Sequence, residues 1–185
     1  MKTTSYKSIV WKSGSAIKLL LFFFENPNKE FYERQVQKGV GLSAGAVNKY
    51  LKLLSGESFI LMEKRGKMNF FRLNRENLVA KHLKISHNLS EPVVAGLKKL
   101  GEEFGVKLYI YGSVARGEDD ENSDWDILVI GSMKVDEMER EINKLRKKFG
   151  RRIKLSIFKR IEWLEMAKKD PAFYENVEKD KIGLV

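Results

Sequence analysis

The sequence predicts an α+β fold in two domains, on three observations. Segments with the 3.6-residue apolar period of helices alternate with short apolar runs typical of strands. The whole net charge of +10 lies in residues 1–90, which hold 16 Lys and Arg against 6 Asp and Glu, while residues 91–185 hold 19 of each. A connector separates the halves. We therefore expect one domain at residues 1–74, a helical connector at 75–90 and a second domain at 91–185.

The uneven charge predicts a polyanionic partner for the first domain, and nucleic acid is the commonest such partner. A Lys-rich surface of a heat-adapted protein is the alternative, but heat adaptation usually raises Glu together with Lys. The chain has no Cys, which suits a reducing cytoplasm. Its longest apolar run, residues 19–24, is far shorter than the ~20 residues of a membrane span. These features predict a cytoplasmic protein without a membrane segment.

The first domain is predicted from its helices and a basic hairpin. An apolar helix at 15–25 ends at Asn26-Pro27, a short helix follows at 30–38, and residues 39–42 form a turn. Ser43 is a good N-cap, after which Val47, Tyr50, Leu51 and Leu54 follow the spacing of one helix face. Strands are expected at 59–65 and 68–73, on either side of Gly66-Lys67.

This order of elements resembles a winged helix-turn-helix domain over about residues 13–74. The segment Gly-Leu-Ser-Ala-Gly-Ala-Val-Asn-Lys-Tyr-Leu-Lys-Leu-Leu looks like the turn and recognition helix of small prokaryotic regulators, and Glu-Lys-Arg-Gly-Lys-Met-Asn-Phe-Phe-Arg-Leu-Asn looks like the wing. The resemblance implies binding to duplex DNA, with helix residues in the major groove and wing residues on phosphates. The candidate DNA-binding residues are Ser43, Gly45, Asn48, Lys49, Lys52, Arg65 and Lys67. Winged helices also serve as docking or dimerisation modules, which is the alternative.

The second domain is predicted to be a small sheet with flanking helices. Pro92 suits the first turn of a helix at 92–104. Strands are expected at 106–111, 124–130 and 151–158. A short helix at 114–117, an amphipathic helix at 135–149 and terminal helices at 161–169 and 171–177 complete the prediction.

One motif in this domain carries the chemistry. Gly112-Ser113 follows the first strand, and ten residues later Asp124-x-Asp126 opens the second. Carboxylates at i and i+2 of a strand point to the same face, where they can share a divalent ion. A Gly-Ser turn exposes backbone N–H groups and a hydroxyl that can hold a phosphate. The alternative is a polar hairpin loop with two surface aspartates.

With its apolar flanks, this motif resembles the minimal nucleotidyltransferases of the DNA polymerase β-like nucleotidyltransferase superfamily. The resemblance implies a small mixed sheet with flanking helices, and transfer of a nucleoside monophosphate from a nucleoside triphosphate. It assigns Asp124 and Asp126 to catalysis and to Mg²⁺ (or Mn²⁺), and Gly112 and Ser113 to the phosphates. Arg116 is a further nucleotide-binding candidate, although it could equally be a surface charge.

Active members of that superfamily usually have a third carboxylate on a later strand, which here is the strand at 151–158. That segment contains no Asp or Glu, and Lys154 or Ser156 takes the expected position. Two functions therefore stay open. One is a nucleotidyltransferase joined to a DNA-binding domain. The other is a DNA-binding regulator or antitoxin whose transferase fold binds nucleotide or a partner protein, and the resemblance implies a HEPN-type partner. A homodimer is also possible.

Overall fold

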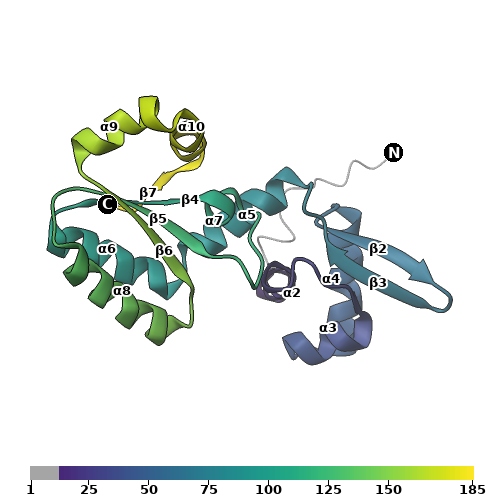
Figure 1. Cartoon of the computed structure of the whole chain (residues 1–185). Coiled ribbons are helices and arrows are strands. Elements are labelled where there is room, and N and C mark those ends of the chain that lie inside the picture. Colours follow the sequence, from purple (N-terminus) through teal and green to yellow (C-terminus); the bar gives the residue numbers. More distant parts are fainter. Residues whose placement is uncertain (1–12) are drawn as a thin grey trace. The chain divides into compact units, whose positions relative to one another are not determined.

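The computed structural model describes residues 13–185, so the first twelve residues of the predicted 1–74 domain lie outside the described part. The fold is α+β, as expected (Figure 1). The chain forms two compact units that meet, in sequence, between Lys84 and Ile85. This boundary falls within helix α5 (Leu78–Leu89), in the segment expected to be a helical connector.

Between residues 13 and 84, the first unit contains three complete helices, the first part of α5 and a three-stranded antiparallel sheet. The helices are α2 (Gly14–Glu25), α3 (Glu33–Val40) and α4 (Ala44–Gly56). The strands are β1 (Phe31–Tyr32), β2 (Ile60–Arg65) and β3 (Met68–Leu73), in the order β1-β3-β2. Apolar side chains of the helices and the sheet form one core, which includes Leu19, Phe23, Val36, Leu51, Leu54 and Phe71. The β2–β3 hairpin extends away from the helices (Figure 1).

Two predictions in this unit need correction. Phe31 and Tyr32 were expected in a helix at 30–38, but they form β1, because their backbones pair with Phe71 and Phe70 of β3. Helix α3 then runs on to Val40, and the turn begins at Gly41, whose φ of 63° is the left-handed conformation that glycine adopts without strain. The predicted N-cap is confirmed, since Ser43 Oγ accepts a hydrogen bond from the Ala46 N–H at 3.3 Å.

The second unit alternates helices and strands. After α5 come α6 (Pro92–Phe104), β4 (Lys107–Tyr111), α7 (Gly112–Arg116), β5 (Trp125–Ile130), α8 (Val135–Phe149) and β6 (Ile153–Phe158). The chain ends with α9 (Arg160–Lys169), α10 (Pro171–Asp180) and β7 (Ile182–Gly183). The sheet order is β6-β5-β4-β7, with β5 and β6 parallel and the other pairs antiparallel.

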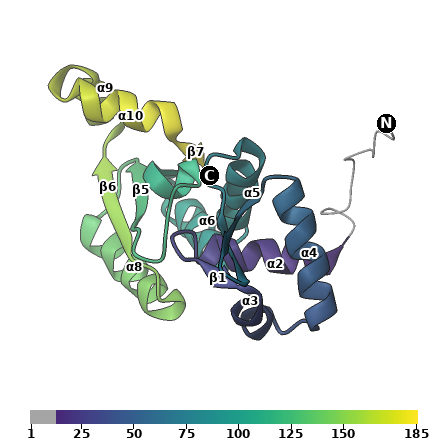
Figure 2. The same ribbon diagram turned by 90° about the vertical axis from the view of Figure 1, so that its right-hand side faces the viewer.

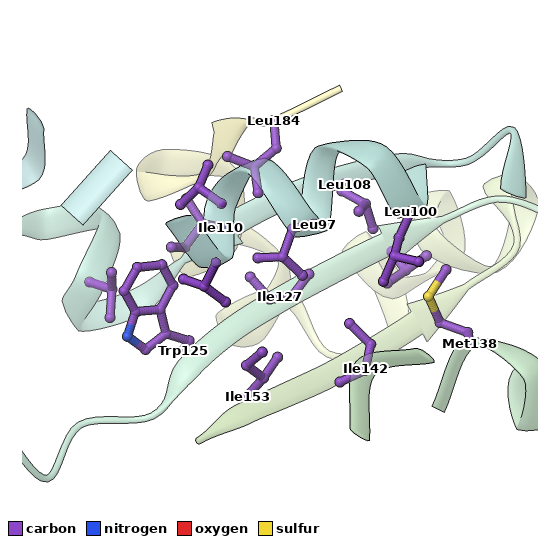
Figure 3. Close-up of a cluster of buried hydrophobic side chains, with 14 of the residues drawn as sticks. Leu97, Leu100, Leu108, Ile110, Trp125, Ile127, Met138, Ile142, Ile153 and Leu184 are labelled. Carbon is purple, nitrogen blue, oxygen red and sulfur yellow. The ribbon is translucent and has the colours of Figure 1, made fainter. Parts of the chain in front are cut away.

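Helices cover both faces of this sheet. On one face, side chains of α6 and α8 pack against alternate strand residues such as Leu108, Ile110 and Ile127 (Figure 3). On the other face lie α9 and α10 (Figures 1 and 2), which contribute Trp163 and Val177 to a smaller core around Leu128. Asp126 belongs to this second face, because its neighbours Trp125 and Ile127 lie in the core on the face covered by α6 and α8.

Several further differences from the sequence prediction appear in this unit. Helix α10 runs on to Asp180 rather than ending at residue 177, and β6 begins at Ile153 rather than at residue 151. Strand β7 was not predicted, since its two residues are strand only through backbone pairing with Tyr109 and Ile110. Helix α7 begins at Gly112 rather than at Val114. Strand β5 begins at Trp125, so Asp124 lies immediately before it. No helix in the described part of the chain is both long and apolar enough to cross a membrane.

Candidate active site in the second unit

The turn between β4 and α7 requires glycine at position 112. Gly112 has a φ of 73°, in the left-handed region that is costly for other residues. A Cβ atom there would lie 2.7 Å from Oδ2 of Asp126, much closer than carbon and oxygen atoms pack. The backbone at the start of α7 therefore lies directly against one of the two predicted carboxylates. The Gly-Ser turn therefore lies beside the acidic pair, as the motif predicted.

Asp126 is half-buried within β5, opposite Tyr111 of β4. Burial raises the pKa of its carboxyl above the ordinary value; Lys154 opposes this shift, the nearby charge of Asp124 adds to it, and Arg116 opposes it. A carboxylate in such a place gains from a bound cation, because burial penalises its charged form. Asp126 is therefore the stronger cation-binding candidate of the pair.

Asp124 is instead held by two basic side chains. Its Oδ2 is 2.7 Å from Lys154 Nζ, and its Oδ1 is 3.1 Å from Arg152 Nε. The hydrogen bond from Lys154 lowers the pKa of Asp124 the most; partial burial opposes it, and the charges of Arg152 and Lys154 lower the pKa further. The two aspartates, Lys154 and Arg152 together carry no net charge.

The structure resolves which β6 residue stands beside the aspartates. β6 runs parallel to β5, with Lys154 opposite Asp126 and Ser156 opposite Leu128. Ser156 Oγ instead lies 3.0 Å from the hydroxyl of Tyr111. Lys154 thus occupies the position where the superfamily resemblance implies a third carboxylate. Arg152 was not among the predicted site residues. Its only signal in the sequence is that it forms a basic pair with Arg151 immediately before β6.

The other predicted phosphate-binding residues lie on α7. Ser113 is in its first turn and is half-buried. Arg116 ends the helix, and its guanidinium pairs with Glu118 and Asp180, each at 2.7 Å. Arg116 would have to leave at least one of these partners to reach a phosphate. Asp180, at the end of α10, has no counterpart in the sequence prediction.

The donor groups can be compared with the metal that the motif implies. Carboxylate oxygens are the ligands Mg²⁺ prefers, and Mg²⁺ keeps several waters and substrate oxygens around it. Asp124 and Asp126 therefore fit one such ion. No group of three or more His, Asp or Glu side chains that could hold a metal occurs within residues 13–185.

The second unit matches a known protein family. Residues 93–183, from α6 to β7, match the family model described as nucleotidyltransferase domain. No curated protein sequence matches the chain significantly. Two solved structures show limited similarity to the whole chain: HmgR of Pseudomonas aeruginosa, at 16% identity over 89% of this chain and 71% of HmgR (TM-score 0.35), and the archaeal chromatin protein TrmBL2, at 16% identity over 89% and 70% (TM-score 0.27).

The predicted DNA-binding residues of the first unit lie on α4 and the β2–β3 hairpin. Lys49, Lys52 and Lys67 are exposed. Gly45 faces open space, since a Cβ there would meet no atom within 4 Å. Ser43 is used as the N-cap of α4, and Asn48 Nδ2 donates to Glu33 Oε1 at 3.1 Å.

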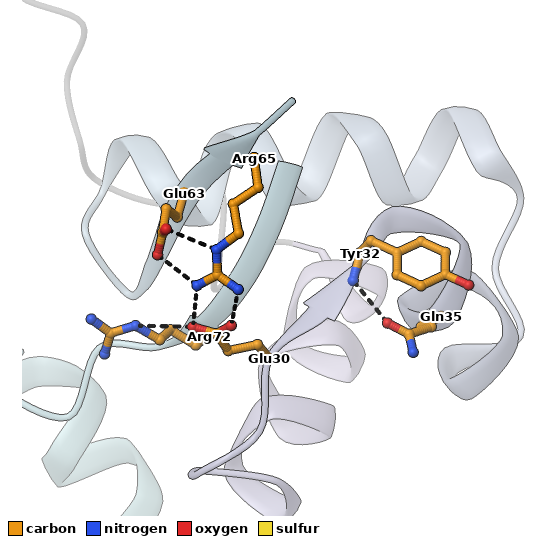
Figure 4. Close-up of polar contacts among 6 residues, drawn as sticks. All are labelled: Glu30, Tyr32, Gln35, Glu63, Arg65 and Arg72. Carbon is orange, nitrogen blue, oxygen red and sulfur yellow. Dashed lines mark hydrogen bonds and ion pairs between the residues drawn. The ribbon is translucent and has the colours of Figure 1, made fainter. Parts of the chain in front are cut away.

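Arg65 differs from the other predicted wing cations, because acidic partners surround it (Figure 4). Its guanidinium donates to Glu30 at 2.7 Å and to Glu63 at 2.8 Å, and it lies 4.9 Å from the centroid of the Phe70 ring. Arg72 lies 3.9 Å from Glu30 in the same cluster. The charge of Arg65 is largely offset by Glu30 and Glu63, which leaves Lys67 as the more available of the two predicted wing cations.

Proposed function

We propose that the second unit binds a nucleoside triphosphate and transfers its nucleoside monophosphate group to an acceptor hydroxyl. The observation that carries this proposal is the contact of Gly112 with Asp126, which puts a phosphate-binding type of turn beside a half-buried carboxylate. The family match over residues 93–183 supports the same reaction class.

In this proposal the residues have separate roles. The backbone N–H groups and the hydroxyl of Gly112-Ser113 hold the terminal phosphates, and Arg116 is an additional phosphate contact. Asp124 and Asp126 hold one Mg²⁺, or Mn²⁺, which when bound supplies positive charge against the phosphate oxygens. In the reaction the acceptor oxygen bonds to the α-phosphorus, the bond to the bridging oxygen breaks, pyrophosphate leaves, and the hydroxyl proton passes to solvent or to a nearby base.

The ion pair between Lys154 and Asp124 supports a second candidate function. A lysine at this position competes with a metal for the carboxylate and contributes no ligand of its own. The unit would then bind nucleotide as a signal, or dock a partner protein, without turnover. A HEPN-type toxin is the partner implied by the sequence resemblance, in which case the chain is an antitoxin.

We further propose that the first unit is a winged helix-turn-helix that binds duplex DNA. The exposed lysines of α4 and of the hairpin, together with the excess of basic residues in this half, support this role. DNA binding is compatible with either function of the second unit. A docking or dimerisation module is the alternative role for the same fold.

Nucleotide and metal binding can be tested by thermal denaturation. A ligand that binds only the folded state stabilises it by about 1.4 kcal/mol at ten times its Kd. ATP with Mg²⁺ should therefore raise the Tm of the wild type, and the Asp124→Asn/Asp126→Asn variant should lose the part of this increase that depends on Mg²⁺. Incubation with α-labelled triphosphates and cell extract then separates transfer from binding alone. An unchanged Mg²⁺-dependent shift in the double variant would rule out the two aspartates as metal ligands.

A further inference from the structure

The second unit contains a cavity of about 440 Å³ that the proposed reaction does not use. It lies on the same sheet face as the aspartates but at the opposite end of the strands, where β4 begins at Lys107 and β5 ends at Ile130. Helices α9 and α10 form its other walls. Ligand pockets in proteins have volumes of roughly 300–1,000 Å³, so this cavity is large enough for a small molecule.

Aromatic rings form much of the wall. Trp163 of α9 and Tyr174 of α10 pack with ring centroids 5.0 Å apart and an interplanar angle of 38°. Trp163 is buried, and the Lys181 ammonium covers one face of the Tyr109 ring of β4, with Nζ 4.8 Å from the ring centroid. Tyr174 is half-buried and lines the cavity. Flat aromatic surfaces of this kind favour a planar ring in the ligand, since offset stacking contributes about 0.5–1.5 kcal/mol beyond the burial of apolar area.

The charges around the cavity favour an anion. The carboxylate of Glu178 accepts from Trp163 Nε1 at 3.0 Å and forms an ion pair with Lys181, so it is already neutralised. Lys107 and Arg160 are exposed at the rim, and neither forms an ion pair with another described residue. Two available cations beside a neutralised pair give the cavity a net positive charge. A guanidinium is well suited to a phosphate, which it can bind through two parallel hydrogen bonds.

From these observations we infer that this cavity is a second nucleotide site, separate from the carboxylate pair, which takes a nucleoside monophosphate. The base packs against Tyr174, and the phosphate binds Arg160 and Lys107. No carboxylate remains available there to hold a metal, so binding does not require Mg²⁺. The inference does not depend on the proposed transferase reaction.

Isothermal titration of the full chain with AMP in EDTA tests the inference. We expect AMP to bind the wild type with a Kd below about 1 mM. Arg160→Ala and Lys107→Ala should each weaken binding at least about fivefold. Adenosine, which lacks the phosphate, and inorganic phosphate, which lacks the ring, should both bind at least about tenfold more weakly than AMP. Lys168→Ala is the matched control, since Lys168 is an exposed cation of α9 outside the cavity, and it should leave the Kd unchanged.

The Asp124→Asn/Asp126→Asn variant separates this site from the proposed active site, and it should bind AMP in EDTA as the wild type does. Absence of AMP binding at millimolar concentration would overturn the inference. So would AMP binding that both rim variants leave unchanged, or binding that the double Asn variant removes. Inorganic phosphate binding as tightly as AMP would exclude the aromatic part of the site. Far-UV circular dichroism of each variant confirms that weakened binding does not come from unfolding.

Discussion

Replacement of Gly112 by Ala tests the contact on which the proposed active site depends. A non-glycine residue in the left-handed conformation costs about 1–2 kcal/mol. The new Cβ would also lie 2.7 Å from Asp126 Oδ2, so the carboxylate must rotate away. Moving a side chain off its preferred rotamer costs about 1 kcal/mol. We therefore expect Gly112→Ala to lower the free energy of unfolding of the second unit by about 2–3 kcal/mol.

Gly150→Ala provides a control for the backbone cost alone. Gly150, at the end of α8, has a φ of 63°, and a Cβ there would meet no atom within 4 Å. It should cost only about 1–2 kcal/mol, and the excess at Gly112 measures the contact with Asp126. In an Asp126→Ala background that excess should disappear, which gives a coupling of about 1 kcal/mol between the two positions.

Urea denaturation followed by tryptophan fluorescence can measure these differences. Trp125 and Trp163 lie in the second unit, and Trp11 is the third tryptophan of the chain. A Trp11→Phe background therefore confines the signal to the unit under study. Equal costs for Gly112→Ala and Gly150→Ala, with or without Asp126, would refute the close packing of the turn against the carboxylate.

Three further predictions concern the rest of the molecule. Lys154→Asp supplies the absent carboxylate beside Asp124, so Mg²⁺-dependent labelling of the protein or its partner by α-labelled triphosphate should increase over the wild type. Replacing Lys49 and Lys52 by Ala should weaken duplex DNA binding by the full chain and reduce the slope of log K against log salt by about 2, since each lost phosphate contact changes it by about 1. Glu178→Gln should destabilise the second unit by less than about 1 kcal/mol at neutral pH, as expected for a partly exposed ion pair.

The Glu178 prediction has a defined pH dependence. Burial raises the pKa of Glu178, but hydrogen bonds from Lys181 and Trp163 outweigh it, so the pKa lies below the ordinary value of 4.5. A depressed folded-state pKa stabilises the fold above the unfolded-state pKa and loses that effect as pH falls through the folded value. The difference in unfolding free energy between wild type and Glu178→Gln should be constant above about pH 5 and shrink below 4.5. A difference that grows on acidification would contradict the assignment.

Each of the other two predictions has a matched outcome that would contradict it. Ser156→Asp places a carboxylate two residues further along β6, beside Tyr111 rather than Asp124, and should not increase labelling. If it does so while Lys154→Asp does not, the register of the site is wrong. If the full chain does not bind duplex DNA at low salt, the first unit is a docking module.

Local patterns in the sequence predicted most helices and strands, because apolar spacing and end signals depend only on neighbouring residues. Pro92, Ser43 and the amphipathic pattern of α8 are examples. The sequence could not predict β1 and β7, whose two-residue strands exist only through backbone pairing with distant strands. Phe31-Tyr32 was therefore assigned to a helix by its neighbours. A prediction from local pattern fails where a tertiary contact decides the conformation.

In the candidate site, too, local pattern predicted some features and tertiary contacts decided the others. The motif grouped Gly112 and Ser113 with the two aspartates by its resemblance to a known family, and the antiparallel pairing of β4 with β5 brings them together in the structure. Alternation along β6 also predicted that Lys154 and Ser156 share a face. Only the register of β6 on β5 decides between them, and a parallel crossover through α8 leaves this register undetermined in the sequence. The ion pair of Arg65 with Glu30 was not foreseeable either, since 35 residues separate them.

The lysine opposite Asp126 also has a consequence at the level of the gene. Lysine and glutamate codons differ by a single base, so one point mutation at position 154 would exchange the ammonium paired with Asp124 for a carboxylate. The new side chain would be exposed, as Lys154 is, so β5, β6 and the turn at Gly112 would need no change to accept it. The same scaffold is therefore one base change from a site with three carboxylates, and under the proposed function that change separates a nucleotide-binding protein from a metal-dependent enzyme.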